Sequence, residues 1–504
     1  MKKYIISLLS LVLIFSACDL DIQPESDLTF NGFWETEEAA RAAHVGIAAR
    51  HRDYANTFFT MGEIRSDIWG GLTIEDPHSM ELINNDISVS KVYYSNWADF
   101  YGFMHNINDF LTNVPNVPFK SEEDKNHILA QVYGIRAQVY YTMLKAWGDV
   151  PITTEPLVEV DLETLKKPRS PKEEVMQQVK SDIAKSLELF GNSNRKWLGK
   201  NIYWSKAATL ALKGDAYLWS GKVLGGGQPD FTEAKNALAS ITGFELVPYN
   251  KLWGEDNEEN NEFIFAFDYQ QDQAGNYYAN FTGRIVDFNP LFDADGVSAK
   301  DQSVLGDGVS VVAGGANRYG PSEKTLLMLD DKNDNRYNTF IRLYTNDEGH
   351  YPYEPSDDTY EASVLKKFLG SIYDDGQRQN YNNVPLYRYA DVVLMLAEAK
   401  NNLNEDPSAE INAIRQRAYG DNFEDYRFVN GDQASNRKAI LDERFKEFVG
   451  EGKRWWDLVR AGDGIVFQEL ESLNASEAYK IYYSISQEML ANDDQLTQTA
   501  GYGN

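Results

Sequence analysis

The residue type in shortest supply is cysteine, since Cys18 is the single thiol in 504 residues. A disulfide needs two cysteines and a thiolate metal site needs several, so the chain can build neither. The six histidines include no pair three or four residues apart, which excludes a His-Glu-x-x-His zinc motif. We therefore expect no metal ion and no cofactor.

Signatures of common enzyme classes are also missing. There is no Gly-x-Ser-x-Gly elbow and no phosphate-binding P-loop. A pair of carboxylates can cleave a glycosidic bond, but 77 acidic residues offer so many pairs that this carries no weight. The segment from Asp331 to Arg336 begins like a calcium loop, yet Arg336 occupies the position that requires glycine. We predict no catalytic residue; a surface hydrolase is the remotest of the alternatives.

Long apolar runs are absent except at the start of the chain. Residues 4–17 are almost wholly apolar and follow two lysines. Such a run makes about 21 Å of helix, short of the ~30 Å hydrocarbon core of a membrane. It indicates a signal peptide over residues 1–17, and its Ser-Ala-Cys ending resembles a bacterial lipobox that would lipidate Cys18. The alternative is a plain signal peptide with an incidental cysteine. If Cys18 is lipidated, residues 18–30 are the lipid anchor and the tether.

Positive charge is scarce. The chain has 48 Lys and Arg against 77 Asp and Glu, a net charge of -29. Such a surface repels nucleic acid and anionic lipid, so we expect neither as a partner. It argues only weakly against uronic acid or sulfated ligands, because a local basic patch can override the net charge.

Aromatic residues, in contrast, are abundant: 30 Tyr, 25 Phe and 10 Trp make up 13% of the chain. Aromatic rings fill cores, and they also form platforms on which flat ligands such as sugars stack. Composition does not separate these two uses.

Apolar periodicity predicts a largely helical protein. Thr36 is a candidate N-cap, and Ser170, Pro171 and Glu173 form a candidate capping-box start. The predicted helices cover residues 34–50, 97–111, 126–147, 170–190, 204–223, 389–403, 408–418 and 437–461.

Residues 31–504 are predicted to form a single domain. Its helical scaffold would come from about 31–224 and 385–504, and a loop-rich region with short strands from about 225–384.

Many charges lie within these apolar helices. Charges in such places usually pair with one another to offset their desolvation, so we interpret them as scaffold ion pairs. They are Arg136, Asp149, Arg388, Asp391, Glu398, Glu443, Arg444, Glu447, Glu451, Arg454 and Asp457.

Several motifs, in this order, resemble the SusD/RagB family of outer-membrane lipoproteins from Bacteroidota. They are LDIQP at 20–24, FWET at 33–36, YGIRAQVYYTMLKAWGDVPIT at 133–153, KAATLALKGDAYL at 206–218, YRYADVVLMLAEAKN at 387–401, INAIRQRA at 411–418 and LDERFKEFVGEGKRWWDLVRAGD at 441–463.

This resemblance implies an all-α fold of four TPR-like helix pairs, with a loop-rich region that contains short strands. It also implies a non-catalytic protein on the cell surface, anchored in the outer membrane. Such a protein binds oligosaccharides, or peptides in some branches, and passes them to a SusC-like TonB-dependent transporter.

A sugar site would need aromatic faces together with amide, carboxylate and guanidinium groups on loops. Two loop regions qualify, at 67–94 and 268–320. Trp69 is the leading candidate, because we expect Gly70 and Gly71 to leave its ring face uncovered. The candidate ligand-binding residues are Trp69, Tyr93, Tyr277, Tyr278, Arg284, Arg318 and Tyr319.

Overall fold

A computed structural model describes most of the chain. The described residues are 33–73, 80–157, 166–283, 285–301, 315–345, 351, 358–367, 371–372, 376 and 378–503. The predicted signal peptide, Cys18, the predicted tether and Arg284 lie outside these residues. No helix among the described residues has the length and apolarity needed to cross a membrane.

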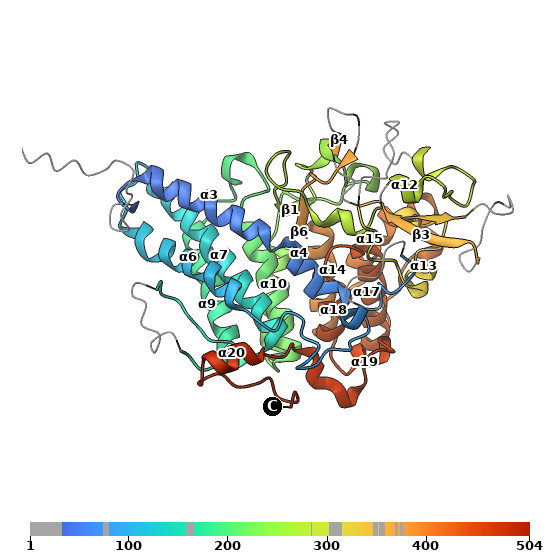
Figure 1. Ribbon diagram of the computed structural model, residues 1–504. Helices are drawn as coiled ribbons and strands as arrows, with labels where there is room; N and C mark the ends of the chain where they lie inside the picture. The colour runs from blue at the N-terminus through green and yellow to red at the C-terminus, as the bar shows by residue number, and fades with distance from the viewer. Residues whose placement is uncertain are drawn as a thin grey trace, which may run out of the picture.

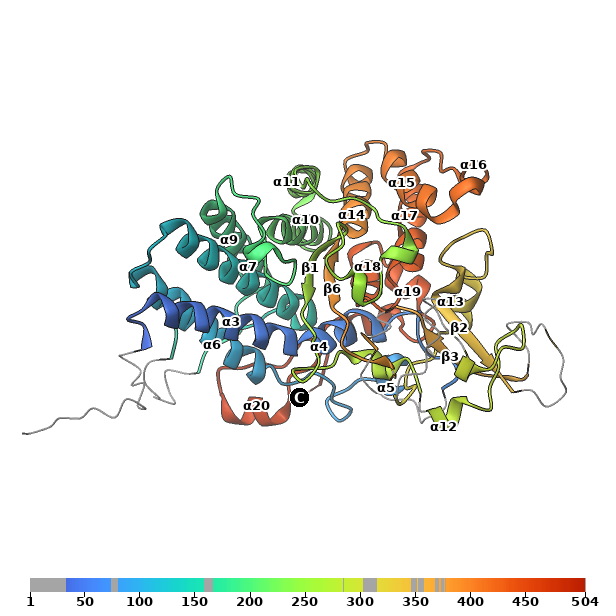
Figure 2. The same cartoon turned by 90° about the horizontal axis from the view of Figure 1, so that it is seen from above.

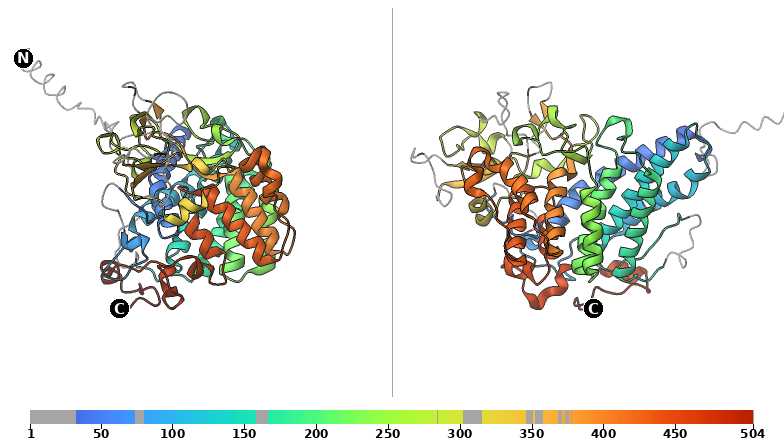
Figure 3. Two further views of the ribbon diagram at one scale, coloured as in Figure 1. Left: turned by 90° about the vertical axis from the view of Figure 1, so that its right-hand side faces the viewer. Right: turned by 180° about the vertical axis from the view of Figure 1, so that it is seen from behind.

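Four helical hairpins form the body of the protein. They pair α3 (Glu37–Asp53) with α6 (Ala98–Asn113), α7 (Glu122–Trp147) with α9 (Lys172–Phe190), α10 (Lys206–Val223) with α11 (Gly227–Ala239), and α14 (Tyr389–Asn402) with α15 (Ser408–Tyr419). Each hairpin packs on the next through α6 on α7, α9 on α10 and α11 on α14. The hairpins therefore make one continuous stack (Figures 1 and 3), which confirms the predicted all-α scaffold.

Further helices and six short strands complete the fold over the described residues, together with short segments of 3-10 helix. The remaining helices are α4 (Ala55–Phe59), a π-helix (Thr60–Ile64), α5 (Met80–Ile83), α12 (Ile285–Phe288), α13 (Glu323–Met328), α16 (Phe423–Tyr426), α17 (Gln433–Phe448), α18 (Arg454–Arg460), α19 (Ile465–Glu469) and α20 (Gln487–Asn492). The strands are β1 (Phe263–Phe267), β2 (Phe340–Tyr344), β3 (Tyr360–Leu365), β4 (Ser371–Ile372), β5 (Arg378–Gln379) and β6 (Val384–Arg388).

Helix α7 shows why the local sequence folds this way. The Ser121 side chain accepts a hydrogen bond from the Asp124 amide at 3.2 Å and caps the first turn. Acidic residues there favour the positive end of the helix dipole. Gly148 follows Trp147 with φ +71° and ends the helix. Nearly every side chain from Ile128 onward is buried, so α7 lies at the centre of the stack.

Helices α10 and α11 approach closely because α10 carries glycine at two contact points. A Cβ atom at Gly214 would lie 2.4 Å from the Leu238 side chain. A Cβ atom at Gly221 would lie 2.5 Å from the Phe231 ring. The small residues of α10 thus allow α11 to pack closely against it. Helix α11 lies within the region from about 225 to 384 that was predicted to be loop-rich.

Two other local predictions were wrong. Helix α9 starts at Lys172, and the first amide of the helix donates to the Asp149 carboxylate at 2.8 Å and not to the predicted cap Ser170. The Ser170 backbone amide donates to the Val150 carbonyl at 3.1 Å. The single helix predicted over 437–461 is two helices, α17 and α18. The helix is interrupted between them because Gly450 and Gly452 adopt φ values of +83° and +71°.

Three two-stranded antiparallel sheets pair β1 with β6, β2 with β3 and β4 with β5. In the first, Phe267 at the end of β1 pairs with Val384 at the start of β6. These two strands lie side by side next to α10 (Figure 2). The chain between them, residues 268–383, is called the excursion below. Its described parts lie along the upper and right-hand sides of the scaffold in Figure 1.

Candidate functional site

The charges within the apolar helices form a buried network centred on Arg388. This guanidinium is 2.7 Å from carboxylate oxygens of Glu262, Glu447 and Glu451, and its side chain is only 1% exposed. Arg417 on α15 pairs with Glu262 and Glu447 as well. The network therefore joins the start of β1, the end of β6, α15 and α17.

Other scaffold charges also pair. Arg444 contacts Asp391 and Asp457, each at 2.8 Å. The remaining buried pairs include Arg136 with Asp182, Arg454 with Asp67, and Arg460 with Asp215 and Glu398. These contacts, with those of Glu443, confirm the interpretation of the motif charges as ion pairs for all but Asp149, whose carboxylate instead accepts a hydrogen bond from the Lys172 backbone amide at 2.8 Å. Within the described residues, no three His, Cys, Asp or Glu side chains are grouped to hold a metal ion.

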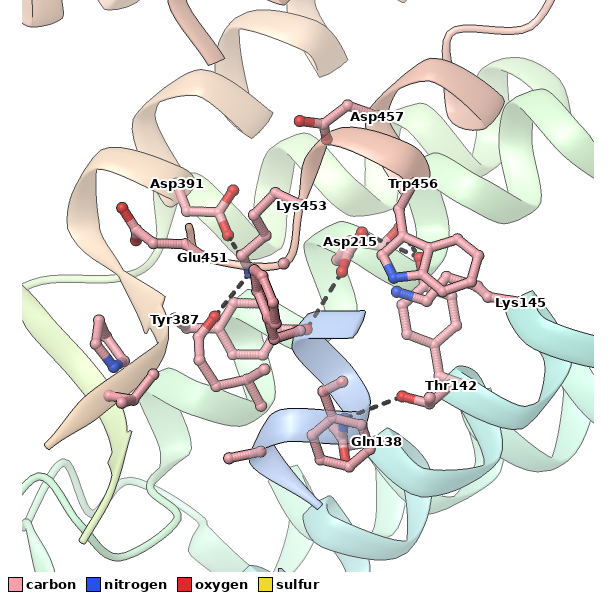
Figure 4. Close-up of a pocket in the computed structure, with 18 of the residues that line it drawn as sticks. Gln138, Thr142, Lys145, Asp215, Tyr387, Asp391, Glu451, Lys453, Trp456 and Asp457 are labelled. Atoms are coloured by element: carbon pink, nitrogen blue, oxygen red, sulfur yellow. Dashed lines mark hydrogen bonds and ion pairs between the residues drawn. The ribbon is translucent and has the colours of Figure 1, made fainter. Parts of the chain in front are cut away.

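An interior cavity of about 50 Å³ lies beside these pairs (Figure 4). Lys145 projects to its edge, with Nζ 4.3 Å from the ring centre of Tyr141 and 4.8 Å from that of Trp456. Burial lowers the pKa of Lys145 to about 8, although the Asp215 carboxylate opposes this shift. The cavity is far smaller than the ~300 Å³ of the smallest usual ligand pockets. We assign it to the core.

Glu63 is a buried carboxylate that forms no ion pair with any residue the structure describes. Its carboxylate accepts hydrogen bonds from the amides of Gly450 and Gly452, both at 2.7 Å, and from the Trp69 indole at 3.1 Å. Burial nevertheless raises the pKa of Glu63 from 4.5 to about 7. Glu63 thus holds the α17–α18 break against the π-helix.

Glu63 should make stability fall as the pH rises from about 5 to 8. Its pKa is higher in the folded than in the unfolded protein, so between 4.5 and about 7 the folded state binds more protons. The free energy of unfolding should therefore decrease with pH more steeply in the wild type than in Glu63→Gln, which cannot titrate. Urea unfolding across this pH range measures both slopes. Equal slopes would contradict the assignment.

Trp69 does not present an open ring. It is 3% exposed, and its ring stacks on Phe281 with centroids 5.2 Å apart. The expectation that Gly70 and Gly71 leave this ring uncovered is wrong. The Pro321 carbonyl takes up the space, 1.9 Å from where a Cβ atom on Gly71 would lie. Trp69 anchors the excursion to the scaffold.

The other candidates divide between core and surface. Tyr278 is buried and donates its hydroxyl hydrogen bond to the Leu365 carbonyl at 2.9 Å, and Tyr319 is buried against Phe281. Tyr93 is partly exposed and donates to Glu81 at 2.7 Å. Tyr277 lines a surface hollow. Arg318 is partly exposed and lies next to this hollow, because its backbone amide donates to the carbonyl of Asn280, a lining residue, at 2.8 Å.

This hollow has a volume of about 410 Å³ and is named the loop-face hollow. One wall comes from the end of α3 and the start of α4, and the other from the first residues of the excursion. It is lined by Arg52, Asp53, Asn56, Tyr269, Ala274, Gly275, Asn276, Tyr277, Ala279 and Asn280.

The scaffold holds both walls in place. The Tyr277 ring stacks on Phe59 of α4 at 4.7 Å. Asn276 donates to the Asn382 carbonyl and accepts from the Tyr278 amide, both at 2.8 Å, which fixes the turn that carries Tyr277. Arg52 Nη1 donates to the Asp268 carbonyl at 3.1 Å and links the two walls. The hollow is thus preformed.

Several polar groups in the hollow have no partner among the described residues. The side-chain amides of Asn56 and Asn280 make no hydrogen bond there, and Arg52 Nε is buried without an acceptor. Asp53 is exposed, with Arg50 at 3.5 Å. Amides, a guanidinium and a carboxylate are the groups that bind hydroxyls and peptide units. Sequence reasoning missed Arg52, Asp53 and Asn56, since nothing in a helix end signals that a loop will fold against it.

Two family models together match nearly the whole chain. The model described as "SusD family" matches residues 255–502, and the model described as "Starch-binding associating with outer membrane" matches residues 20–218. A SusD-like protein of Formosa agariphila is 25% identical over all of both chains.

Solved structures agree with these matches. NanU of Bacteroides fragilis is 31% identical with a TM-score of 0.83, covering 96% of this chain and 100% of its own. A SusD superfamily protein, also from Bacteroides fragilis, is 30% identical with a TM-score of 0.82, covering 94% and 100%. A likeness of this extent and identity goes beyond the fold. The chain belongs to the SusD family.

Proposed function

We propose that this protein is a cell-surface lipoprotein that captures oligosaccharides and delivers them to a SusC-like TonB-dependent transporter without changing them chemically. Cys18 carries its lipid anchor in the outer membrane. The observation that carries the proposal is the family membership, which extends over both the scaffold and the excursion. The family model for residues 20–218 is itself described by starch binding and the outer membrane.

The loop-face hollow is the site that we assign to the ligand. Its volume lies within the ~300–1,000 Å³ usual for small-molecule sites, and its free amides face an open surface. Of the structures with the same fold, one is a laminarin-binding SusD-like protein, 20% identical with a TM-score of 0.70. At this identity the comparison supports the fold alone, so the ligand class depends on the chemistry of the hollow.

A peptide is the second candidate ligand. The hollow offers several amides, whereas its tyrosines Tyr269 and Tyr277 are mostly buried and present little ring face. Amide groups pair with a peptide backbone as readily as with sugar hydroxyls. The transporter partnership would be the same in either case.

Removing both free amides, in Asn56→Ala with Asn280→Ala, should weaken ligand binding by about tenfold or more, because each lost hydrogen bond costs ~0.5–1.5 kcal/mol. Calorimetry against a panel of neutral oligosaccharides and mixed peptides measures the loss and identifies the ligand class. Asn116→Ala, an exposed asparagine after α6, is the matched control and should bind like the wild type.

Two results would contradict this proposal. Unchanged affinity in the double variant would remove the hollow as the site. Release of shortened products from any ligand in the panel by the purified protein would make it an enzyme. Binding of peptides and no oligosaccharide would select the second candidate.

A further inference from the structure

A second hollow, larger than the loop-face hollow, lies between the excursion and the C-terminal helices. Its volume is about 800 Å³, and it shares no residue with the loop-face hollow. We name it the cationic cleft. It is lined by Leu246, Pro248, Tyr249, Asn250, Leu252, Trp253, Asn335, Arg336, Thr339, Lys366, Lys367, Arg388, Arg417, Lys446 and Glu447.

The lining holds six basic side chains and a single acid, in a chain of net charge -29. Five of the six have a carboxylate within 4.0 Å. They are Arg336, Lys367, Arg388, Arg417 and Lys446, paired with Asp334, Glu262, Glu443, Glu447 and Glu451. Folding alone accounts for these five, because each offsets a buried acid.

Lys366 is different. Its backbone amide donates to the Thr339 carbonyl at 2.8 Å, which fixes the residue just after β3. Its ammonium makes no hydrogen bond or ion pair with any residue that the structure describes, although the side chain is partly buried. Burial lowers the pKa of Lys366, and the more distant Asp293 carboxylate only partly opposes this. A partly desolvated cation without a counter-ion gains more from an anion than a solvated one does.

Aromatic and amide groups lie in the same cleft. Trp253 is partly exposed, with Lys367 Nζ 5.5 Å and Arg388 Cζ 5.9 Å from its ring centre. Asn250, on the neighbouring turn, is exposed and its side chain has no partner among the described residues. The face of an indole ring suits the face of a sugar ring, and the amide suits its hydroxyls.

We propose that the cationic cleft binds an anionic sugar residue, whose carboxylate or sulfate meets the Lys366 ammonium while its ring packs on Trp253. This inference rests on the proposed function only in taking a saccharide as the ligand, and it adds a second binding site to that function. Lys366 adds, at this one place, a positive charge that no carboxylate of the described residues pairs with, and this charge attracts an acidic glycan that the net charge of the chain repels.

Calorimetry at low salt with purified protein tests the proposal with three probes: trigalacturonate, its fully methyl-esterified form and a κ-carrageenan tetrasaccharide. Esterification removes the charge and keeps the sugar ring. We expect trigalacturonate or the sulfated tetrasaccharide to bind about tenfold or more tightly than the neutral ester. Which of the two does so identifies the acidic group.

Lys366→Gln should abolish this preference for the anion. The substitution leaves no buried acid without a partner, because Lys366 pairs with none, so the fold is retained. The matched control is Lys438→Gln, a largely exposed lysine of α17 that pairs with Asp442. It should keep the preference of the wild type.

If neither trigalacturonate nor the sulfated tetrasaccharide binds more tightly than the neutral ester, or if an anion preference survives in Lys366→Gln, the proposal is overturned. The two sites are separable in the same experiment. The Asn56→Ala, Asn280→Ala double variant should retain the anion preference, and Lys366→Gln should retain the ligand of the loop-face hollow. Undiminished binding of the loop-face ligand by the double variant would therefore count against the loop-face hollow alone, and an unchanged anion preference in Lys366→Gln would count against the cationic cleft alone.

Discussion

Replacing Arg388 by methionine should lower the free energy of unfolding by about 3–5 kcal/mol, the cost of breaking a buried ion pair on one side. Methionine keeps much of the side-chain volume but removes a cation that contacts three buried carboxylates, those of Glu262, Glu447 and Glu451. Arg417 and Lys367 would remain to offset three acids that lie away from water. Urea unfolding followed by circular dichroism measures the loss.

Arg427→Met is the matched control for Arg388→Met. Arg427 forms its ion pair with one carboxylate, that of Glu424, and both side chains are well exposed. Solvent-exposed pairs of this kind contribute little, so this variant should unfold like the wild type. If Arg388→Met is no more destabilised than Arg427→Met, the Arg388 network does not hold the scaffold together.

Gly62→Ala should be strongly destabilising, although it adds only one methyl group. A Cβ atom at this position would lie 1.9 Å from the Gly452 carbonyl oxygen and 2.8 Å from the Trp456 indole nitrogen. Neither neighbour can yield cheaply, since one is backbone and the other is packed in the core. We expect a loss of about 3 kcal/mol or more in the free energy of unfolding.

Gly102→Ala provides the comparison within one substitution type. Gly102 lies inside α6 and a Cβ atom there would meet nothing within 4 Å. Alanine should stabilise this helix by about 0.5–1 kcal/mol, because it restricts the unfolded chain and has the higher helix propensity. The melting temperatures of the two variants should therefore move in opposite directions. A tolerated Gly62→Ala would show that the π-helix does not pack on the α17–α18 break.

The scaffold was predictable because its signals are local. Apolar periodicity placed α7, α10 and α14, and Thr36 caps α3 as expected, accepting from the Ala39 amide at 3.2 Å. Pairing of the scaffold charges followed from residue type and surroundings. The partners did not follow, since Arg388 pairs across the excursion with Glu262, 126 residues earlier in the chain.

The candidate site was only partly predictable, for the same reason. Tyr277 lines the loop-face hollow, but Trp69 is covered by Phe281 and Tyr319, more than 200 residues further along the chain. Whether an aromatic ring is covered depends on such distant contacts, which composition and spacing do not encode. Arg52 and Asn56 carry no distinguishing pattern at all and become site residues only because residues 269–280 fold against them.

The pairing of Phe267 with Val384 also has an evolutionary consequence. The chain leaves the scaffold and returns to it at neighbouring points of one small sheet, so a change in the length of an outer loop between them leaves the register of the two ends intact. The excursion is nevertheless part of the body, because Arg336 and Lys367 pair with the buried acids Glu443 and Glu451. Selection can therefore vary the outer loops freely, whereas the residues that contact the scaffold must stay complementary to it.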